Sequence, residues 1–125
     1  MKLEVGLHGA AALVVGERDT ARALGSGEVE VLGTPRVIAL CEEATVAALA
    51  GKVPEGHTTV GMRVQIDHLH PTAIGQRVEA EAVLEKIEGR RLTFTVSAAD
   101  AKGLVAAGKV TRVMVEIDRF MSKAD

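Results

Sequence analysis

Residues 33–51 read GTPRVIALCEEATVAALAG, and this stretch decides the fold because it predicts one well-delimited helix. Thr34 is a good N-cap, Pro35 suits the first helical position, and Gly51 is a natural C-terminal stop. The helix between them runs for about four turns and is apolar on most of its circumference. Such a helix is typical of a protein interior, so we expect it to be buried.

Downstream of this helix, apolar residues recur at every second position, which is the period of a β-strand. The expected strands cover residues 58–70, 77–87, 92–98 and 104–118, with turns at 88–90 and 101–103. One face of the first strand carries Val60, Met62, Val64, Ile66 and His68. Upstream, residues 1–15 are expected to be extended and residues 28–32 to form a short strand. Alternation broken by glycine-bearing turns predicts an antiparallel meander.

A buried helix and a one-sided sheet must pack on each other, because neither has another apolar partner in the chain. The sequence therefore predicts an α+β protein with a long central helix wrapped by an antiparallel β-sheet. We expect residues 1–125 to form a single domain. Such a sheet leaves exposed edges, and pairing them across a two-fold axis predicts a homodimer or higher homo-oligomer.

The composition limits the classes of partner that the protein is expected to bind. Nearly half of the residues are apolar, which excludes a disordered chain, and the net charge of -2 gives no basic surplus for nucleic acid. The apolar run AAALVV near the N-terminus is too short to cross a membrane. Cys41 is the single cysteine, so an intrachain disulfide is impossible, and a reducing cytoplasmic location is expected.

Glu42 is the first candidate catalytic residue. On the helix it shares a stripe with Ile38, Thr45 and Leu49. A carboxylate on an apolar stripe is costly unless it is paired, and a general base is one reason to keep it there. The alternative is that the stripe is half-buried and Glu42 reaches solvent. Neighbouring Glu43 points about 100° away around the helix and is expected to be a solvated charge.

Thr34 and His68 are two further candidates. A hydroxyl at a helix N-terminus lies in a positive field beside free N–H groups, which suits a thioester carbonyl or an attacking water, in addition to capping the helix. A neutral imidazole near a carboxylate can relay protons. The alternative for His68 is a core or rim histidine bonded to the backbone.

Gly61 and Arg112 are candidates for substrate binding. A glycine inside a strand allows close approach of a ligand, although it also suits a bulge. Arg112 interrupts an apolar strand and could hold a carboxylate or a CoA phosphate, or it could point to solvent. His68 and His70 share a strand face, but no Cys pair or zinc-type spacing accompanies them. We expect neither a metal nor a cofactor.

These residues taken together resemble the fluoroacetyl-CoA thioesterase family of the hot-dog superfamily, over about residues 33–120. Thr34 and Glu42 match the family's catalytic Thr at the helix start and its Glu eight residues on. Gly61 and His68 match its strand Gly and the His seven residues later, and Arg112 matches its late-strand Arg. The resemblance implies a hot-dog fold whose Thr, Glu and His act on a thioester, while the Gly N–H holds its oxygen.

One departure concerns the acyl group. The fluoroacetyl-specific enzyme gates its pocket with Phe before the catalytic Thr, whereas this chain has ALGSGEVEVLG there, without an aromatic residue. The resemblance therefore implies hydrolysis of short or medium acyl-CoA rather than specificity for fluoroacetyl-CoA. Two alternatives are a non-catalytic acyl-CoA binder on the same fold and an acyl hydratase. The acid–base residues favour the enzyme over the binder, and the loop before the helix lacks a hydratase-like Asp-to-His pair.

Overall fold

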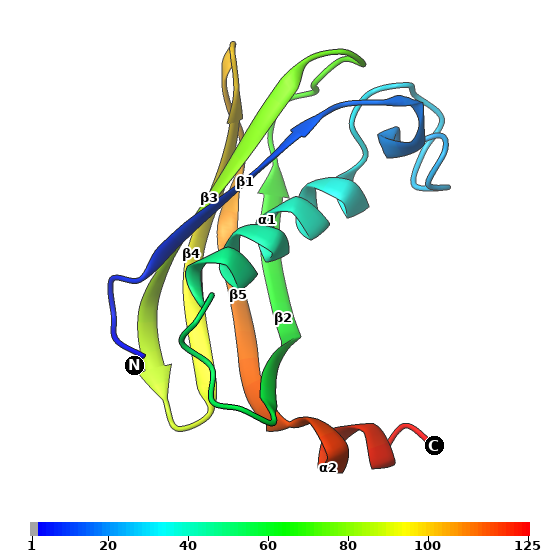
Figure 1. Cartoon of the computed structure of the whole chain (residues 1–125). Helices are drawn as coiled ribbons and strands as arrows, with labels where there is room; N and C mark the ends of the chain where they lie inside the picture. The colour runs from blue at the N-terminus through cyan, green and yellow to red at the C-terminus, as the bar shows by residue number, and fades with distance from the viewer. Residues whose placement is uncertain (1–2) are drawn as a thin grey trace.

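In the computed structural model, which describes residues 3–125, an antiparallel sheet curls around one long helix (Figure 1). The sheet consists of β1 (His8–Val14), β2 (His57–His68), β3 (Arg77–Glu88), β4 (Arg91–Asp100) and β5 (Gly103–Glu116). The helices are α1 (Thr34–Ala48), the short 3₁₀ turn η1 (Glu17–Asp19) and the C-terminal α2 (Ile117–Ser122). Within residues 3–125, no helix is long and apolar enough to cross a membrane. The α+β prediction, a helix wrapped by an antiparallel sheet, is confirmed.

The strand order differs from the expected meander. It is β1-β3-β4-β5-β2, so β3, β4 and β5 follow one another while β2 pairs with β5 at the far edge. The other side of β3 is occupied by β1, and every residue of β1 pairs with β3. The edge of β5 is therefore the one left for β2, and the chain crosses the sheet between β2 and β3.

Helix α1 begins one residue away from its predicted start. The carbonyl of Gly33 accepts the N–H of Val37, so Gly33 is the N-cap and Thr34 is already helical. The prediction that Thr34 caps the helix is therefore wrong, and its hydroxyl is available for another partner. The helix ends at Ala48, and Gly51 follows with a φ of +74°, as its role as a stop signal requires.

One side of α1 forms the core. Val37, Leu40, Cys41, Ala44 and Ala48 are buried there against the apolar faces of β3 and β4. Gly9 lets β1 cross the helix closely, because a Cβ at this position would collide with the helix backbone at Ala44 and Ala48. The opposite side of the helix is open, and Val46 is 52% exposed. The predicted burial therefore holds for one face of the helix within a single chain.

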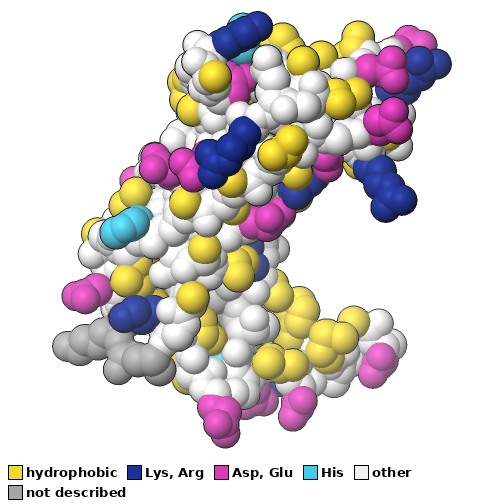
Figure 2. Space-filling view, turned by 45° about the horizontal axis from the view of Figure 1, so that its top comes forward, with side chains coloured by type: hydrophobic (Ala, Val, Ile, Leu, Met, Phe, Trp, Pro, Cys, Tyr) yellow, Lys and Arg dark blue, Asp and Glu magenta, His cyan; other side chains and the backbone are white. Residues whose placement is uncertain are grey.

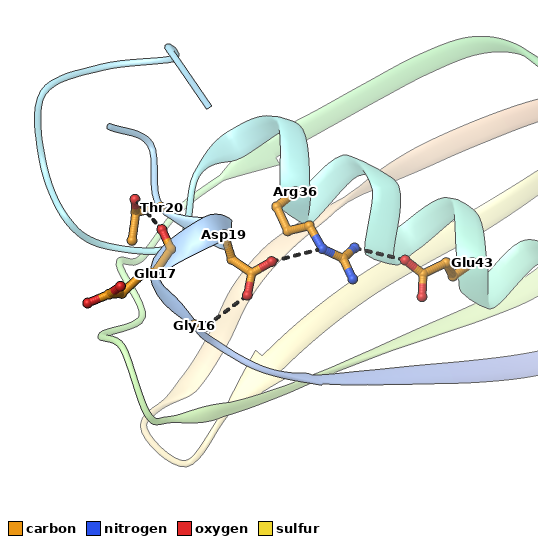
Figure 3. A network of polar contacts seen from close by, with 6 residues as sticks. All are labelled: Gly16, Glu17, Asp19, Thr20, Arg36 and Glu43. Carbon is orange, nitrogen blue, oxygen red and sulfur yellow. Dashed lines mark hydrogen bonds and ion pairs between the residues drawn. The ribbon is translucent and has the colours of Figure 1, made fainter. Parts of the chain in front are cut away.

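The segment before α1 is a compact loop. The expected strand at 28–32 is absent, since only isolated bridges occur at Val31 and Leu32. A chain of polar contacts holds the start of the loop on the helix (Figure 3). Arg36 Nε lies 3.3 Å from Asp19 Oδ1, and Arg36 Nη1 lies 2.8 Å from Glu43 Oε2. At the other end of the chain, β5 stops at Glu116 and α2 replaces the predicted end of the strand.

A bulge divides β2 into two halves. Gly61 pairs with Arg112 and Arg63 with Thr111, so Met62 is the extra residue. The extra residue reverses the alternation of faces, and Met62 is 44% exposed instead of lying on the inner face with Val64 as predicted. In a regular strand, Gly61 and His68 would face opposite sides because seven residues separate them. The bulge turns both toward α1.

Candidate active site

Helix α1 and strand β2 bring Thr34 and His68 together. Thr34 is the first residue of the helix and His68 the last residue of the strand. The Thr34 hydroxyl shares a hydrogen bond of 2.8 Å with Nδ1 of His68. The sequence placed both residues in the site without predicting that they touch.

The surroundings of His68 favour the neutral form of its imidazole. Its pKa lies below the ordinary value chiefly because burial disfavours the cation, while the nearby backbone of His70 opposes this effect. Its second nitrogen, Nε2, is buried and has no hydrogen-bond partner among residues 3–125. A neutral imidazole has one donor and one acceptor nitrogen, so this free nitrogen can exchange a proton or hydrogen-bond with a bound molecule.

The second group of polar residues lies farther along α1. Glu42 Oε2 is 3.4 Å from Nη1 of Arg112, and the side chains are 34% and 9% exposed, respectively. Gly61 faces the same carboxylate, because a Cβ there would overlap Glu42 Oε2. The glycine therefore leaves the space that the carboxylate occupies. The Glu42 stripe is half-buried, and its carboxylate has a charged partner within the chain.

Arg112 is held inside the protein rather than at the surface. Burial lowers the pKa of its guanidinium from the ordinary value, and the Glu42 carboxylate opposes this shift. Nε donates to Thr59 Oγ1 at 2.9 Å and Nη2 donates to the Thr59 carbonyl at 3.0 Å. Sequence reasoning missed Thr59, because its position beside Arg112 depends on the register between β2 and β5. That register has no local sequence signature.

The backbone N–H of Gly61 is directed to the free edge of the sheet. Ile117 N–H donates to the Gly56 carbonyl at 3.0 Å, in the same register as the following β2–β5 pairs. Hydrogen-bonded pairs recur at every second residue of an antiparallel ladder. Val60 and Val113 are therefore such a pair, and Gly61 and Arg112 are not. The Gly61 N–H consequently points away from β5 and is available to an acceptor outside the sheet.

The two groups lie along one side of α1. Eight residues separate Thr34 from Glu42, which is about 12 Å along the helix axis. A shallow hollow of about 390 Å³ lies beside Glu42 and Arg112, and another of about 230 Å³ lies beside His68. A ligand that uses both groups must therefore extend along the helix.

Other candidate chemistry is absent from the described part of the chain. Burial raises the pKa of the Cys41 thiol to about 11, so this residue is a core side chain and not a nucleophile. Within residues 3–125, no group of three or more His, Cys, Asp and Glu side chains is arranged to hold a metal ion. Glu43, the neighbour of Glu42, is exposed and paired with Arg36.

Comparison with known sequences identifies the family. Residues 15–118 match the family model described as fluoroacetyl-CoA-specific thioesterase. The fluoroacetyl-CoA thioesterase of Streptantibioticus cattleyicolor is 32% identical over 94 residues, which cover 75% of this chain and 68% of that protein. The range matched by the family model includes Thr34, Glu42, Gly61, His68 and Arg112.

Solved structures give the same result. The fluoroacetyl-CoA thioesterase FlK is similar with a TM-score of 0.92 and 30% identity, covering 99% of this chain and 96% of that chain. A mutant of FlK in complex with acetyl-CoA has a TM-score of 0.92 at 28% identity, covering 98% and 96%. A hot-dog-like protein from Thermanaerovibrio acidaminovorans has a TM-score of 0.88 at 27% identity, covering 98% and 90%. The chain belongs to the fluoroacetyl-CoA-specific thioesterase family and is an acyl-CoA thioesterase with the hot-dog fold.

Proposed function

We propose that this thioesterase hydrolyses short or medium acyl-CoA thioesters to the free acid and CoA. The observation that carries the proposal is the alignment of Thr34–His68 and Glu42–Arg112 along one side of α1, next to Gly61.

In the proposed mechanism, Glu42 acts as the general base for water or as the nucleophile itself. The Gly61 N–H polarises the thioester carbonyl, because it points out of the sheet toward an acceptor. Thr34 and His68 position water and move protons, so that the departing CoA sulfur leaves as a thiol. Arg112 borders the thioester site and holds the Glu42 carboxylate at 3.4 Å.

The acyl range follows from the loop before α1. A mutant of FlK was solved in complex with acetyl-CoA, so a small acyl thioester suits a site of this family. The corresponding loop of this chain, residues 21–33, contains no aromatic residue, and its Leu24 approaches Gly33. A loop without aromatic side chains offers no aromatic gate, and we therefore propose acyl-CoA substrates without a preference for fluorine.

A substrate series tests this proposal. The purified chain is assayed for thiol release from acetyl-, fluoroacetyl-, butyryl-, hexanoyl- and octanoyl-CoA, with kcat/KM measured for each. We expect turnover of at least one unfluorinated thioester and no preference for fluoroacetyl-CoA by many orders of magnitude. Absence of turnover in the whole series would contradict the proposed hydrolysis, and an overwhelming fluoroacetyl preference would contradict the acyl range.

We also propose that the chain is a homodimer or a higher homo-oligomer. Strands β1 and β2 are the edges of the sheet, and unpaired edges are normally covered. Hydrophobic side chains also gather on α2, on the side facing the hollow between this helix and the body (Figure 2). Ile117, Phe120 and Met121 are all more than one third exposed there. Sedimentation at micromolar concentration should give a dimer or larger species, and a stable monomer would contradict this.

Residues 1–125 are proposed to act as one domain in the cytoplasm. A single cluster of buried residues draws on α1 and on β3, β4 and β5, which favours one domain. The single cysteine is a free, buried thiol, which is compatible with a reducing compartment.

A further inference from the structure

We infer that Thr59 is a positioning residue of the thioester site. It holds the Arg112 guanidinium in the orientation that presents Nη1 to the Glu42 carboxylate. The inference rests on the proposed role of Glu42 and adds a residue that acts through Arg112 without touching the reacting atoms.

The contacts of the guanidinium are divided between two residues. Its Nε donates to the Thr59 hydroxyl oxygen at 2.9 Å, and its Nη2 donates to the Thr59 carbonyl at 3.0 Å. The remaining Nη1 lies 3.4 Å from Glu42 Oε2. Because the guanidinium is planar and rigid, fixing Nε and Nη2 also fixes the direction of Nη1. The two bonds to Thr59 are shorter than the contact with Glu42, so Thr59 is the anchor and Glu42 the group that is oriented.

The strand register explains why residue 59 occupies this place. Gly61 lies directly opposite Arg112 on β5, and Thr59 lies opposite Met114. Thr59 is therefore the diagonal neighbour of Arg112 on the same face, within reach of a long side chain. Because Gly61 has no side chain, Arg112 can pass over it and reach Thr59 and Glu42 together.

Burial makes the anchor important. The Arg112 side chain is only 9% exposed, so water has little access to replace a lost partner. The other charged residues that line the hollow beside Glu42 are Arg112 from β5 and Glu43 from the same helix. Glu43 is engaged by Arg36, which leaves Arg112 as the cation that orients Glu42. Without the Thr59 hydroxyl, only the bond from Nη2 to the Thr59 carbonyl remains, and a single bond no longer fixes the direction of Nη1.

The variants for the test are Thr59→Val, Thr59→Ser and the control Thr58→Val. Valine keeps the shape and the strand preference of threonine but removes the hydroxyl. Serine restores the hydroxyl, and Thr58 is an exposed neighbour. The first measurement is the rate of solvent exchange of the Arg112 Nε–H by NMR, with its resonance assigned by its loss in Arg112→Lys. The second measurement is kcat and KM, determined separately on the best acyl-CoA. Circular dichroism confirms folding.

We expect faster Nε–H exchange in Thr59→Val, with kcat reduced about tenfold and KM changed less than threefold. This loss is smaller than the roughly 10²-fold effect of a fully misplaced catalytic group, because the Thr59 carbonyl still holds Nη2. Thr59→Ser should restore both readouts, and Thr58→Val should alter neither. Unchanged exchange in Thr59→Val would overturn the anchor itself. Faster exchange with normal kcat, while Glu42→Gln is inactive, would overturn the positioning role alone. Full activity of Glu42→Gln would instead overturn the proposed role of Glu42, and the exchange measurement would still decide whether Thr59 anchors Arg112.

Discussion

The two polar groups along helix α1, one at each end of the candidate site, differ in charge. At the helix start, Thr34 and His68 form a neutral pair, since burial keeps the imidazole uncharged. Two turns farther along, Glu42 and Arg112 form an ion pair. Both ends are built from the same helix, but their partners come from different strands. The difference indicates that burial and partner, rather than position on the helix, decide which end is neutral and which is charged.

The strongest test removes the charge from the ionic end. Glu42→Gln keeps the size and hydrogen bonding of the side chain but removes the base. We expect kcat/KM to fall about 10²–10⁴-fold, as for loss of a general base. The measurement is thiol release from the best acyl-CoA, with folding checked by circular dichroism. A folded variant with full activity would show that a group other than Glu42 acts as the base.

A second test displaces the carboxylate without changing its charge. In Gly61→Ala, the new Cβ occupies the space of Glu42 Oε2, so Glu42 must move while the backbone N–H of residue 61 remains. We expect kcat to fall on the order of 10²-fold, the scale for small misplacements of catalytic groups. Gly27→Ala is a matched control, because a Cβ there meets only an ordinary contact with Ala21. Equal activities of the two variants would show that the space at Gly61 does not matter.

At the neutral end, removal of the imidazole should lower turnover less than Glu42→Gln does. His68→Ala is expected to lower kcat/KM on the order of tenfold, below the range for a full general acid or base, because water can partly replace a neutral relay. The fold should remain intact, since His68 lies at the end of β2. A larger loss than in Glu42→Gln would reverse the assigned order of the two ends.

The neutral state of His68 also predicts a pH dependence of stability. Its pKa is lowered in the folded protein, so the unfolded chain binds a proton first as pH falls below the ordinary value of 6.5. The contribution to stability is therefore complete above about pH 6.5 and is lost as pH falls toward the lowered pKa. Chemical denaturation from pH 7.5 to 5 should show this loss, and His68→Ala should show a shallower decline. Identical slopes would mean that His68 is not the group responsible.

The smallest effect is expected at Glu43. Its ion pair with Arg36 is exposed on the Glu43 side, and such pairs contribute little. Glu43→Gln should leave turnover within a few-fold and the free energy of unfolding within about 0.5 kcal/mol. Because Glu42 and Glu43 are neighbours on one helix, this variant is the matched control for Glu42→Gln. A loss of turnover equal to that of Glu42→Gln would remove the distinction between the two carboxylates.

Much of the candidate site could be selected from the sequence because its residues violate local patterns. Glu42 interrupts an apolar stripe, and the structure gives it the buried partner Arg112, whereas Glu43 is exposed as predicted. Thr59 gave no such signal. A threonine in a strand satisfies every local preference, so its role depends entirely on which side chain of another strand reaches it.

The sequence by itself determined the long helix, its end near Gly51, the alternating strands and the selection of candidate site residues. These properties depend on neighbours within one or two turns or pleats, which the sequence displays directly. Only the tertiary structure decided that β2 pairs with β5, that Met62 bulges, and that Arg112 meets Glu42 and Thr59. Pairing between strands distant in sequence follows from the packing of the whole sheet. A one-residue bulge then reverses the faces of a strand, which the alternation alone had assigned incorrectly.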